Sequence, residues 1–203
     1  MSFSTRLRTS NDGGVTSVLA SSVRACGPTF ASALDGTTIN FARASAVIQK
    51  ESRPLLDKLA ATGLDKNTIV IYTTDNGAYQ YMWPQGGTSP FRGDKGTTWE
   101  GGVRVPFVMR WPGTPAGRVS AEIVDSTDLL PTLAAAAGAP GVVAQLKNGA
   151  TFGSRHYKLH LDGYDQTSLL TGKSDKSARD FIFYYGESTL TAIRYRQFKI
   201  TFS

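Results

Sequence analysis

The sequence predicts an α/β fold followed by a small antiparallel β subdomain, and three observations predict it. A helical repeat of apolar residues ends near Gly63, a β-branched run follows over residues 68–74, and short alternating segments occupy residues 156–202. Hydrophobic residues make up 40% of the 203 residues and charged residues 19%. A chain of this composition can bury a sizeable core, so we expect a folded protein.

Residues 1–38 are rich in Ser, Gly and Ala and have no sustained helical or strand period. The apolar stretch from Val15 to Ala20 is short and interrupted by Thr16 and Ser17, which makes a poor signal peptide. The Ser-rich composition bears a faint similarity to a transit peptide. We expect a disordered leader, or one that is structured only by docking on the rest of the protein.

Residues 39–140 are predicted to form one α/β unit. Between Phe41 and Ala61 apolar residues recur at helical spacing, and Pro54 interrupts them. Either a long helix kinks at Pro54, or a new helix begins near Ser52 with Pro54 in its first turn, where proline is tolerated. Gly63 is a plausible C-terminal cap for this helix.

The run Ile69–Tyr72 is continuously apolar, which indicates a strand covered on both faces and hence a parallel sheet. A long glycine-rich loop follows from Ala78 to about Gly102, and loops of this length are usually functional. Val103–Trp111 is predicted to be a second strand, which Pro106 places near an edge or a bulge. The sequence 126–128 offers an N-cap for a helix over residues 129–137, closed by Gly138.

Residues 141–203 are predicted to form the small subdomain. The segments 156–161 and 194–202 alternate between apolar and polar residues, and with residues 180–185 they suggest one small antiparallel sheet. Asp162 and Gly163 form a turn signal between them.

Charge and residue counts exclude several classes of protein. Lys and Arg number 22 against 16 Asp and Glu, which gives a net charge of +6 and permits anionic partners. The basic residues are scattered outside any nucleic-acid-binding motif, so we expect no nucleic-acid partner. A single cysteine, Cys26, excludes an intramolecular disulfide, and two histidines, His156 and His160, argue against a zinc site. No apolar run reaches the roughly 18 residues of a membrane-spanning helix.

Two segments carry candidate chemistry. Asp75-Asn76-Gly77 follows the predicted strand, and at the carboxyl end of such strands carboxylate and amide oxygens suit Ca²⁺ or Mg²⁺. The same tripeptide is also a good turn sequence. Lys95 stands between Gly93 and Gly96, where an ammonium group and backbone amides could approach a tetrahedral anion. The alternative for Lys95 is a solvated lysine on a flexible loop.

The segments 69–77 and 89–106, in this order and spacing, resemble the sulfatase family, specifically its arylsulfatase branch in the alkaline-phosphatase-like superfamily. The resemblance runs from about residue 40 to the end and covers only the family's C-terminal half. Supporting pieces lie at residues 110–113, 128–133, 160–164, 170–172 and 192–194, with Lys199 after them.

This resemblance implies a partial alkaline-phosphatase-like sheet with flanking helices and a small C-terminal antiparallel β subdomain. It implies hydrolysis of sulfuric esters, assisted by Ca²⁺ or another divalent cation, with a sulfate-ester small molecule or a sulfated glycan as substrate. Asp75 and Asn76 match two calcium ligands of the family. Lys95 matches a lysine that contacts the sulfate group of the substrate.

The sequence also departs from the family pattern. The family has an early aspartate pair that completes the calcium site, and a Cys-x-Pro-Ser-x-Arg-type motif whose cysteine becomes the formylglycine nucleophile. This chain has no Asp-Asp pair, and Cys26-Gly27-Pro28-Thr29 matches that motif only in part, with Phe30 near the place of its arginine. A chance Cys-x-Pro is the preferred interpretation of Cys26.

These departures leave two hypotheses for the function. The chain is either a calcium-assisted sulfatase, or a catalytically inactive, truncated sulfatase fragment that acts as an anion- or partner-binding module. Without the family's first half, the strand at Ile69–Tyr72 exposes an edge, which predicts self-association.

Overall fold

The computed structural model describes residues 6–9, 16–19, 53–82, 86, 87 and 89–202. The chain divides into two compact units, Met1–Pro112 and Gly113–Ser203, and each is treated by itself. The domain boundary predicted near residue 140 stays a prediction. Cys26 and the helical positions before Arg53 lie outside the described residues, so the structure leaves the expectations for them as they were.

Two short strands lie in the segment for which we expected no regular structure. β1 (Arg6–Thr9) and β2 (Thr16–Leu19) pair antiparallel, with Arg6 opposite Leu19. Each strand has four residues, which is two repeats of the strand period and too few for a pattern to stand out in the sequence.

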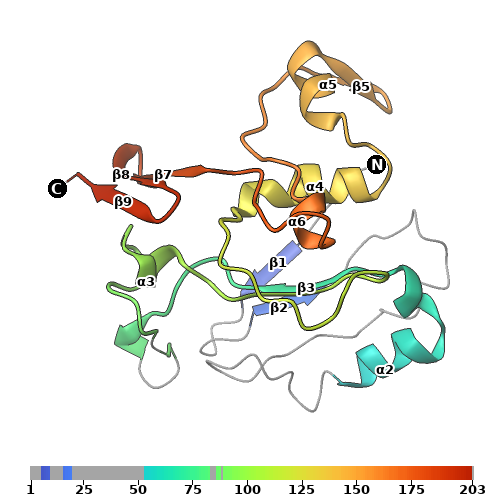
Figure 1. Ribbon diagram of the computed structural model, residues 1–203, viewed down its shortest axis with the longest axis horizontal. Helices are drawn as coiled ribbons and strands as arrows, with labels where there is room; N and C mark the ends of the chain where they lie inside the picture. The colour runs from blue at the N-terminus through green and yellow to red at the C-terminus, as the bar shows by residue number, and fades with distance from the viewer. Residues whose placement is uncertain (1–5, 10–15, 20–52, 83–85, 88, 203) are drawn as a thin grey trace. The chain divides into compact units, whose positions relative to one another are not determined.

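In the first unit, the described residues begin within α2 (Arg53–Ala61), which contains Pro54 (Figure 1). Because the residues before Arg53 lie outside the described part of the chain, both alternatives for Pro54, a kink and a new helix start, stay predictions. Leu55 and Leu59, one turn apart, are the buried residues of this helix. After α2 the chain turns at Gly63 with a φ of +70° and continues into the 3₁₀ helix η3 (Leu64–Asn67), as expected of a capping glycine.

β3 (Val70–Thr73) confirms the predicted strand but not its predicted neighbour. It pairs antiparallel with β4 (Phe107–Arg110), with Val70 opposite Arg110 and Thr73 opposite Phe107. Within the described residues this pair forms a two-stranded sheet, so the expectation of a parallel sheet is wrong for them. The strand is also half-buried rather than covered on both faces. An apolar run specifies a strand, whereas the direction of its partner is set by distant residues.

The second predicted strand is shorter than expected because its first residue belongs to a helix. Val103 ends α3 (Glu100–Val103), and β4 begins directly after Pro106. A proline before the first ladder position removes no donor from the sheet, which is where strands tolerate it. Across the unit, Arg110 donates to Asp65 through a 2.9 Å ion pair and a 2.8 Å bond to the Asp65 carbonyl, and so ties β4 to η3.

The second unit begins its helical part with η5 (Ser126–Asp128), which leads into α4 (Leu129–Ala136). Asp128, one of the predicted residues 126–128, is the N-cap of α4. Asp125 caps η5: the Asp125 carboxylate accepts from Thr127 N–H, and Asp128 accepts from Asp125 N–H. This is a reciprocal capping box. Gly138 follows α4 with a φ of +91°, as predicted for its end. α5 (Val142–Asn148) and α6 (Thr167–Leu170) complete the helices described in this unit.

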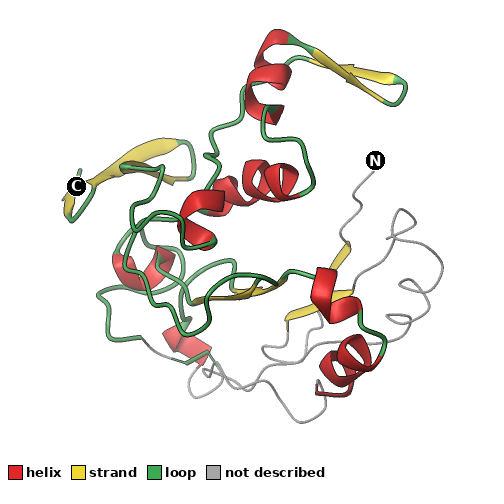
Figure 2. Ribbon diagram, turned by 45° about the vertical axis from the view of Figure 1, so that its right-hand side comes forward, coloured by secondary structure: helices red, strands yellow, loops and turns green. Residues whose placement is uncertain are grey.

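The predicted single antiparallel sheet is two separate sheets, as Figure 2 shows. β5 (Ala150–Phe152) and β6 (Arg155–Tyr157) form an exposed hairpin, so the alternating pattern of residues 156–161 yields only the end of a short strand. β7 (Phe181–Gly186), β8 (Thr189–Tyr195) and β9 (Phe198–Thr201) form a three-stranded meander. The segment 194–202 is split because Arg196, with a φ of +50°, turns the chain between β8 and β9.

The meander has one covered face. Tyr184 and Ala192, which are opposite each other in the ladder, are buried, and Lys199 lies over the Tyr184 ring at 3.9 Å. Within the described ranges no helix combines the length and the apolar character that crossing a bilayer requires.

Candidate functional site

The glycine-rich loop folds back onto the residues that follow β3. Gly77 N–H donates to the carbonyl of Gly102 at 2.9 Å, and Lys95 N–H donates to the carbonyl of Ala78 at 2.8 Å. These two bonds bring Lys95, predicted to bind an anion, alongside the segment that carries Asp75 and Asn76. The structure therefore joins the Lys95 loop through its backbone to the residues directly after Asp75 and Asn76.

Glycine is required where this loop meets the strand exit. A Cβ on Gly77 would overlap the carbonyl oxygen of Gly101, and a Cβ on Gly101 would overlap the carbonyl oxygen of Gly93. Gly101 N–H also donates to the carbonyl of Arg92 at 2.7 Å. Backbone therefore packs directly on backbone here, and the stacking positions the loop without any large side chain.

The turn that presents Lys95 is held at its base by Thr97. Thr97 donates twice to the carbonyl oxygen of Asp94, from its N–H at 3.0 Å and from its hydroxyl at 2.8 Å. Gly96, within this turn, has a φ of +89°, a conformation that glycine adopts without strain. The lysine therefore projects from a closed turn rather than from an open loop.

Lys95 differs from its basic neighbours in what surrounds its charge. Arg92 lies over the Trp99 ring at 3.8 Å, and Arg104 lies over the Phe91 ring and forms a 3.9 Å ion pair with Glu100. Lys95 is exposed, forms no ion pair with a carboxylate of the described residues, and lies 5.7 Å from the centroid of the Tyr79 ring. Its ammonium charge is therefore available to an incoming anion.

Asp75 and Asn76 form the turn that directly follows β3. Asn76 Nδ2 donates to the carbonyl of Gly77 at 2.8 Å, and Thr74 donates to the Asn76 carbonyl. The exposed Asp75 carboxylate forms no hydrogen bond or ion pair with another described residue. The predicted turn is therefore present, and the metal-binding role of Asp75 and Asn76 stays a prediction.

As calcium ligands these two residues fit in kind but fall short in number. Ca²⁺ prefers carboxylate and amide oxygens and takes roughly 6–8 of them. The described part of the chain contains no cluster of three or more His, Cys, Asp or Glu side chains that could enclose a metal ion. A complete shell therefore needs oxygens beyond those of Asp75 and Asn76.

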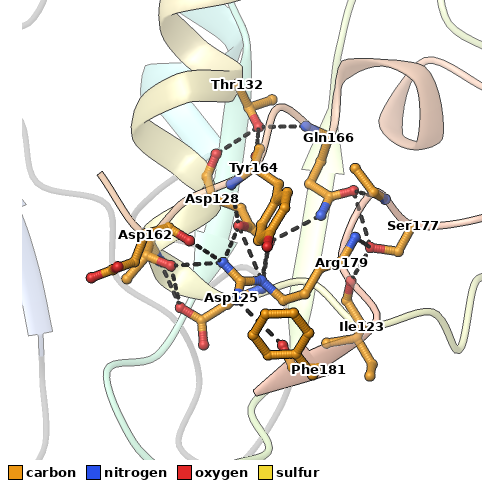
Figure 3. A network of polar contacts seen from close by, with 12 residues as sticks. Ile123, Asp125, Asp128, Thr132, Asp162, Tyr164, Gln166, Ser177, Arg179 and Phe181 are labelled. Carbon is orange, nitrogen blue, oxygen red and sulfur yellow. Dashed lines mark hydrogen bonds and ion pairs between the residues drawn. The ribbon is translucent and has the colours of Figure 1, made fainter. Parts of the chain in front are cut away.

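A buried polar network in the second unit was not predicted. Asp128 and Arg179 are 1% and 7% exposed, and Arg179 Nη2 lies 2.6 Å from Asp128 Oδ1 while Nε lies 3.1 Å from Oδ2 (Figure 3). Asp128 also accepts from the Tyr164 backbone N–H at 2.7 Å and from Gln166 Nε2 at 3.0 Å. Every oxygen of this buried carboxylate is thus satisfied, as a buried charge requires.

The same network joins three segments that are distant in sequence. Arg179 Nη2 donates to the carbonyl of Asp162 at 2.8 Å, and the Arg179 guanidinium lies over the Tyr164 ring at 4.7 Å. Gln166 Oε1 accepts from the Ala178 N–H, and Ser177 donates to the Ile123 carbonyl at 2.6 Å. The network therefore fastens α4 and the two loops around it into one body, which is a structural role.

The network also shifts the pKa values of its two ionised groups. Burial acts to raise the pKa of Asp128, but hydrogen bonds from Arg179, Tyr164 and Gln166 outweigh burial and hold this pKa below its ordinary value. Burial likewise acts to lower the pKa of Arg179, and its pairing with Asp128 raises it above the ordinary value. Both groups stay charged at neutral pH. The sequence marked Asp128 as a helix cap and as the first residue of a segment that resembles the family, but not as half of a buried ion pair, and no local pattern marks Arg179.

Comparisons with known proteins agree with this architecture. Residues 50–139 match the sequence profile of the Sulfatase family. The chain is 43% identical to human arylsulfatase A over 132 residues, which is 64% of this chain and 23% of the relative. It is 36% identical to mouse steryl-sulfatase over 148 residues, 70% of this chain and 22% of the relative.

A solved structure shows the same relationship. The crystal structure of the PsFucS1 sulfatase from Pseudoalteromonas sp. aligns with 75% of this chain and 28% of its own, at 36% identity and a TM-score of 0.63. The chain thus has the alkaline-phosphatase-like fold of a sulfatase over the aligned part. It belongs to the sulfatase family through the segment that holds Asp75, Asn76 and Lys95, and it spans about a quarter of the length of the relatives it matches.

Proposed function

We propose that this chain contributes one side of a sulfatase active site and takes part in the hydrolysis of sulfuric esters. The observation that carries the proposal is the Lys95 loop: the backbone N–H of Lys95 donates to the carbonyl of Ala78, two residues after Asn76, and the side-chain ammonium group stays available. The oxygens of a sulfate group are negatively charged and need positive charge around them: Lys95 supplies one cation, and a metal ion held by Asp75 and Asn76 would supply a second.

In this proposal Lys95 contacts a sulfuryl oxygen of the substrate and stabilises negative charge there during transfer. Asp75 and Asn76 would hold a divalent cation, which we propose to be Ca²⁺, with further oxygens from elsewhere completing its shell. Such a cation polarises the sulfuryl oxygens when it is bound. The glycine contacts of the loop keep Lys95 in position without movement at the moment of reaction.

The proposed substrate class is a sulfate ester, either a small molecule or a sulfated glycan. The names of the relatives, arylsulfatase and steryl-sulfatase, support small ring-bearing sulfates in those proteins. The single ammonium group at Lys95 suits one sulfate group at a time. Nucleic acid is not expected as a partner, because the proposed anion site has one lysine rather than a basic stripe.

A second candidate function is a non-catalytic module that binds an anion or a partner. The observation that favours it is the short donor set, since the described ranges contain no group of three or more His, Cys, Asp or Glu side chains that could hold a metal ion. In this case Lys95 still binds sulfate but turns none over. The predicted self-association through the edge of the strand at Ile69–Tyr72 belongs to this candidate, because a second chain would cover that edge.

Hydrolysis of a chromogenic aryl sulfate by the full chain separates the two candidates. The catalytic proposal expects turnover that rises with added Ca²⁺, is removed by chelator and falls about 10- to 150-fold in Lys95→Ala. The module expects sulfate binding that depends on Lys95 with no turnover. Turnover that Lys95→Ala and chelator both leave unchanged would contradict the proposed site.

A further inference from the structure

Three exposed apolar side chains lie on one short segment, whose first residue, Tyr79, has its ring beside the proposed sulfate-binding lysine. Tyr79, Tyr81 and Met82 have exposed fractions of 40%, 86% and 49%. Exposed apolar area of this size has a free-energy cost in water of about 25 cal/mol per Å². A ligand that covers these side chains would therefore gain free energy from burying their apolar surface.

The segment that carries the tyrosines is closed on itself. Tyr79 begins a turn into the 3₁₀ helix η4 (Gln80–Met82), with Met82 N–H donating to the Tyr79 carbonyl at 3.1 Å. Gly86 accepts from Tyr79 N–H at 3.2 Å and donates to the Met82 carbonyl at 2.6 Å. A Cβ on Gly86 would overlap the Tyr79 carbonyl oxygen, so glycine is required for this closure. The tyrosines are therefore presented on a fixed turn.

The two rings form a pair. Their centroids are 5.7 Å apart and their planes are inclined by 55°. This is within the range of favourable aromatic contacts, so each ring holds the other in place. The hydroxyl group of a tyrosine is attached at the edge of its ring, so the faces of the two rings offer an apolar surface for contact.

Lys95 fixes the position of this surface relative to the proposed sulfate site. Its N–H is bonded to Ala78, the residue before Tyr79, and its Nζ lies 5.7 Å from the Tyr79 ring centroid. An anionic group held by Lys95 therefore has an aromatic surface within the length of one small molecule. The combination of one cation and an adjoining pair of rings matches a ligand with a sulfate group on a flat ring.

We propose that Tyr79 and Tyr81 determine substrate specificity by holding the planar ring of a sulfate ester while Lys95 holds its sulfate group. This inference rests on the proposed function, because it takes Lys95 as the sulfate contact. Stacking of a ring on an aromatic side chain stabilises the bound state, and removal of one such contact weakens binding about 2- to 12-fold. Met82 lies beside the pair and completes its apolar border.

The inference is tested by titrating phenyl sulfate and methyl sulfate separately with the full chain and measuring the affinity of each by ligand-observed NMR. The two probes share the sulfate group and differ in the ring. We expect Tyr81→Ala and Tyr79→Ala to weaken phenyl sulfate about 2- to 12-fold and to leave methyl sulfate unchanged. Tyr81→Phe keeps the ring and should bind phenyl sulfate as the unaltered chain does.

The outcomes separate this inference from the proposed function. Loss of methyl sulfate binding in Lys95→Ala supports the sulfate site by itself. If methyl sulfate binds through Lys95 but phenyl sulfate binds no more tightly and ignores both tyrosine variants, the specificity role is overturned while the proposed function stands. If neither probe binds, or Lys95→Ala binds both as well as before, the sulfate site is wrong and the specificity role fails with it.

Discussion

The backbone N–H of Lys95 donates a 2.8 Å hydrogen bond to the carbonyl of Ala78, the third residue after Asp75. Through this bond a loop lysine and the exit of a strand, about 20 residues apart in sequence, become one local structure. The bond involves only backbone atoms, so it fixes the lysine in place and leaves its side chain available. The predictions below test this arrangement and the buried network that supports the second unit.

The stacked glycines of the loop should not tolerate a methyl group. Gly77→Ala and Gly101→Ala each place a Cβ on a backbone carbonyl oxygen, so we expect a loss of about 1–3 kcal/mol of stability or a displaced loop. Thermal unfolding monitored by circular dichroism measures the loss of stability, and sulfate binding measures the displacement of the loop. Gly141→Ala is the matched control, because a Cβ there meets only the flexible Gln145 side chain at 3.6 Å. If all three variants had the same melting temperature, the backbone contacts of Gly77 and Gly101 would not exist as described.

The buried ion pair should be costly to break from one side. Asp128→Asn leaves the Arg179 charge without its partner, and we expect a loss of about 3–5 kcal/mol in the free energy of unfolding. Urea unfolding of the second unit within the full chain provides the measurement. Arg196→Met is the control: its 3.1 Å pair with Asp180 is exposed, so its removal should have little effect. Similar losses in both variants would count against the network as the main fastening of this unit.

Stability should also depend on pH through Asp128. Its pKa is depressed in the folded protein, so its contribution is fully present above the unfolded value near pH 4 and is lost as the pH falls through the folded pKa. We expect the difference in unfolding free energy between the unaltered chain and Asp128→Asn to shrink below about pH 4. Urea midpoints at a series of pH values from 7 to 2.5 test this. A difference that stays constant over the series would show that the charge of Asp128 contributes nothing.

Metal binding should depend on the residues after β3. We expect Asp75→Asn to weaken Ca²⁺ binding to the full chain, because it removes the one carboxylate of the proposed pair. Isothermal titration with CaCl₂ measures the affinity. Asp65→Asn is the control, since Asp65 is engaged by Arg110 and lies outside the proposed site. Calcium binding that is equal in both variants would place the ligands elsewhere.

Local signals in the sequence predicted the elements well, because their causes are local. Gly63 and Gly138 marked the turns after two helices through their positive φ angles. Asp75, Asn76 and Lys95 were singled out from contiguous motifs, and their roles stay predictions. Each of these depends on neighbouring residues or on a contiguous motif.

The features that escaped prediction are those set by distant residues. The apolar run at β3 carries no information on whether β4 runs parallel or antiparallel to it. Asp128 and Arg179 are 51 residues apart, and neither belongs to a local sequence pattern that predicts a buried ion pair. No sequence pattern connects Tyr79 with Lys95, because the 5.7 Å distance between the tyrosine ring and the lysine Nζ depends on how the loop folds back.

Calcium-dependent hydrolysis of an aryl sulfate by the full chain, compared with Lys95→Ala and Lys95→Arg, tests the central claim most directly. The account predicts turnover that chelator removes, that Lys95→Ala reduces by about 10- to 150-fold, and that Lys95→Arg partly restores. Arg104→Ala is the matched control, because Arg104 already pairs with Glu100 and should leave the rate unchanged. A rate that is the same in Lys95→Ala as in the unaltered chain would contradict the claim that Lys95 binds the sulfate group.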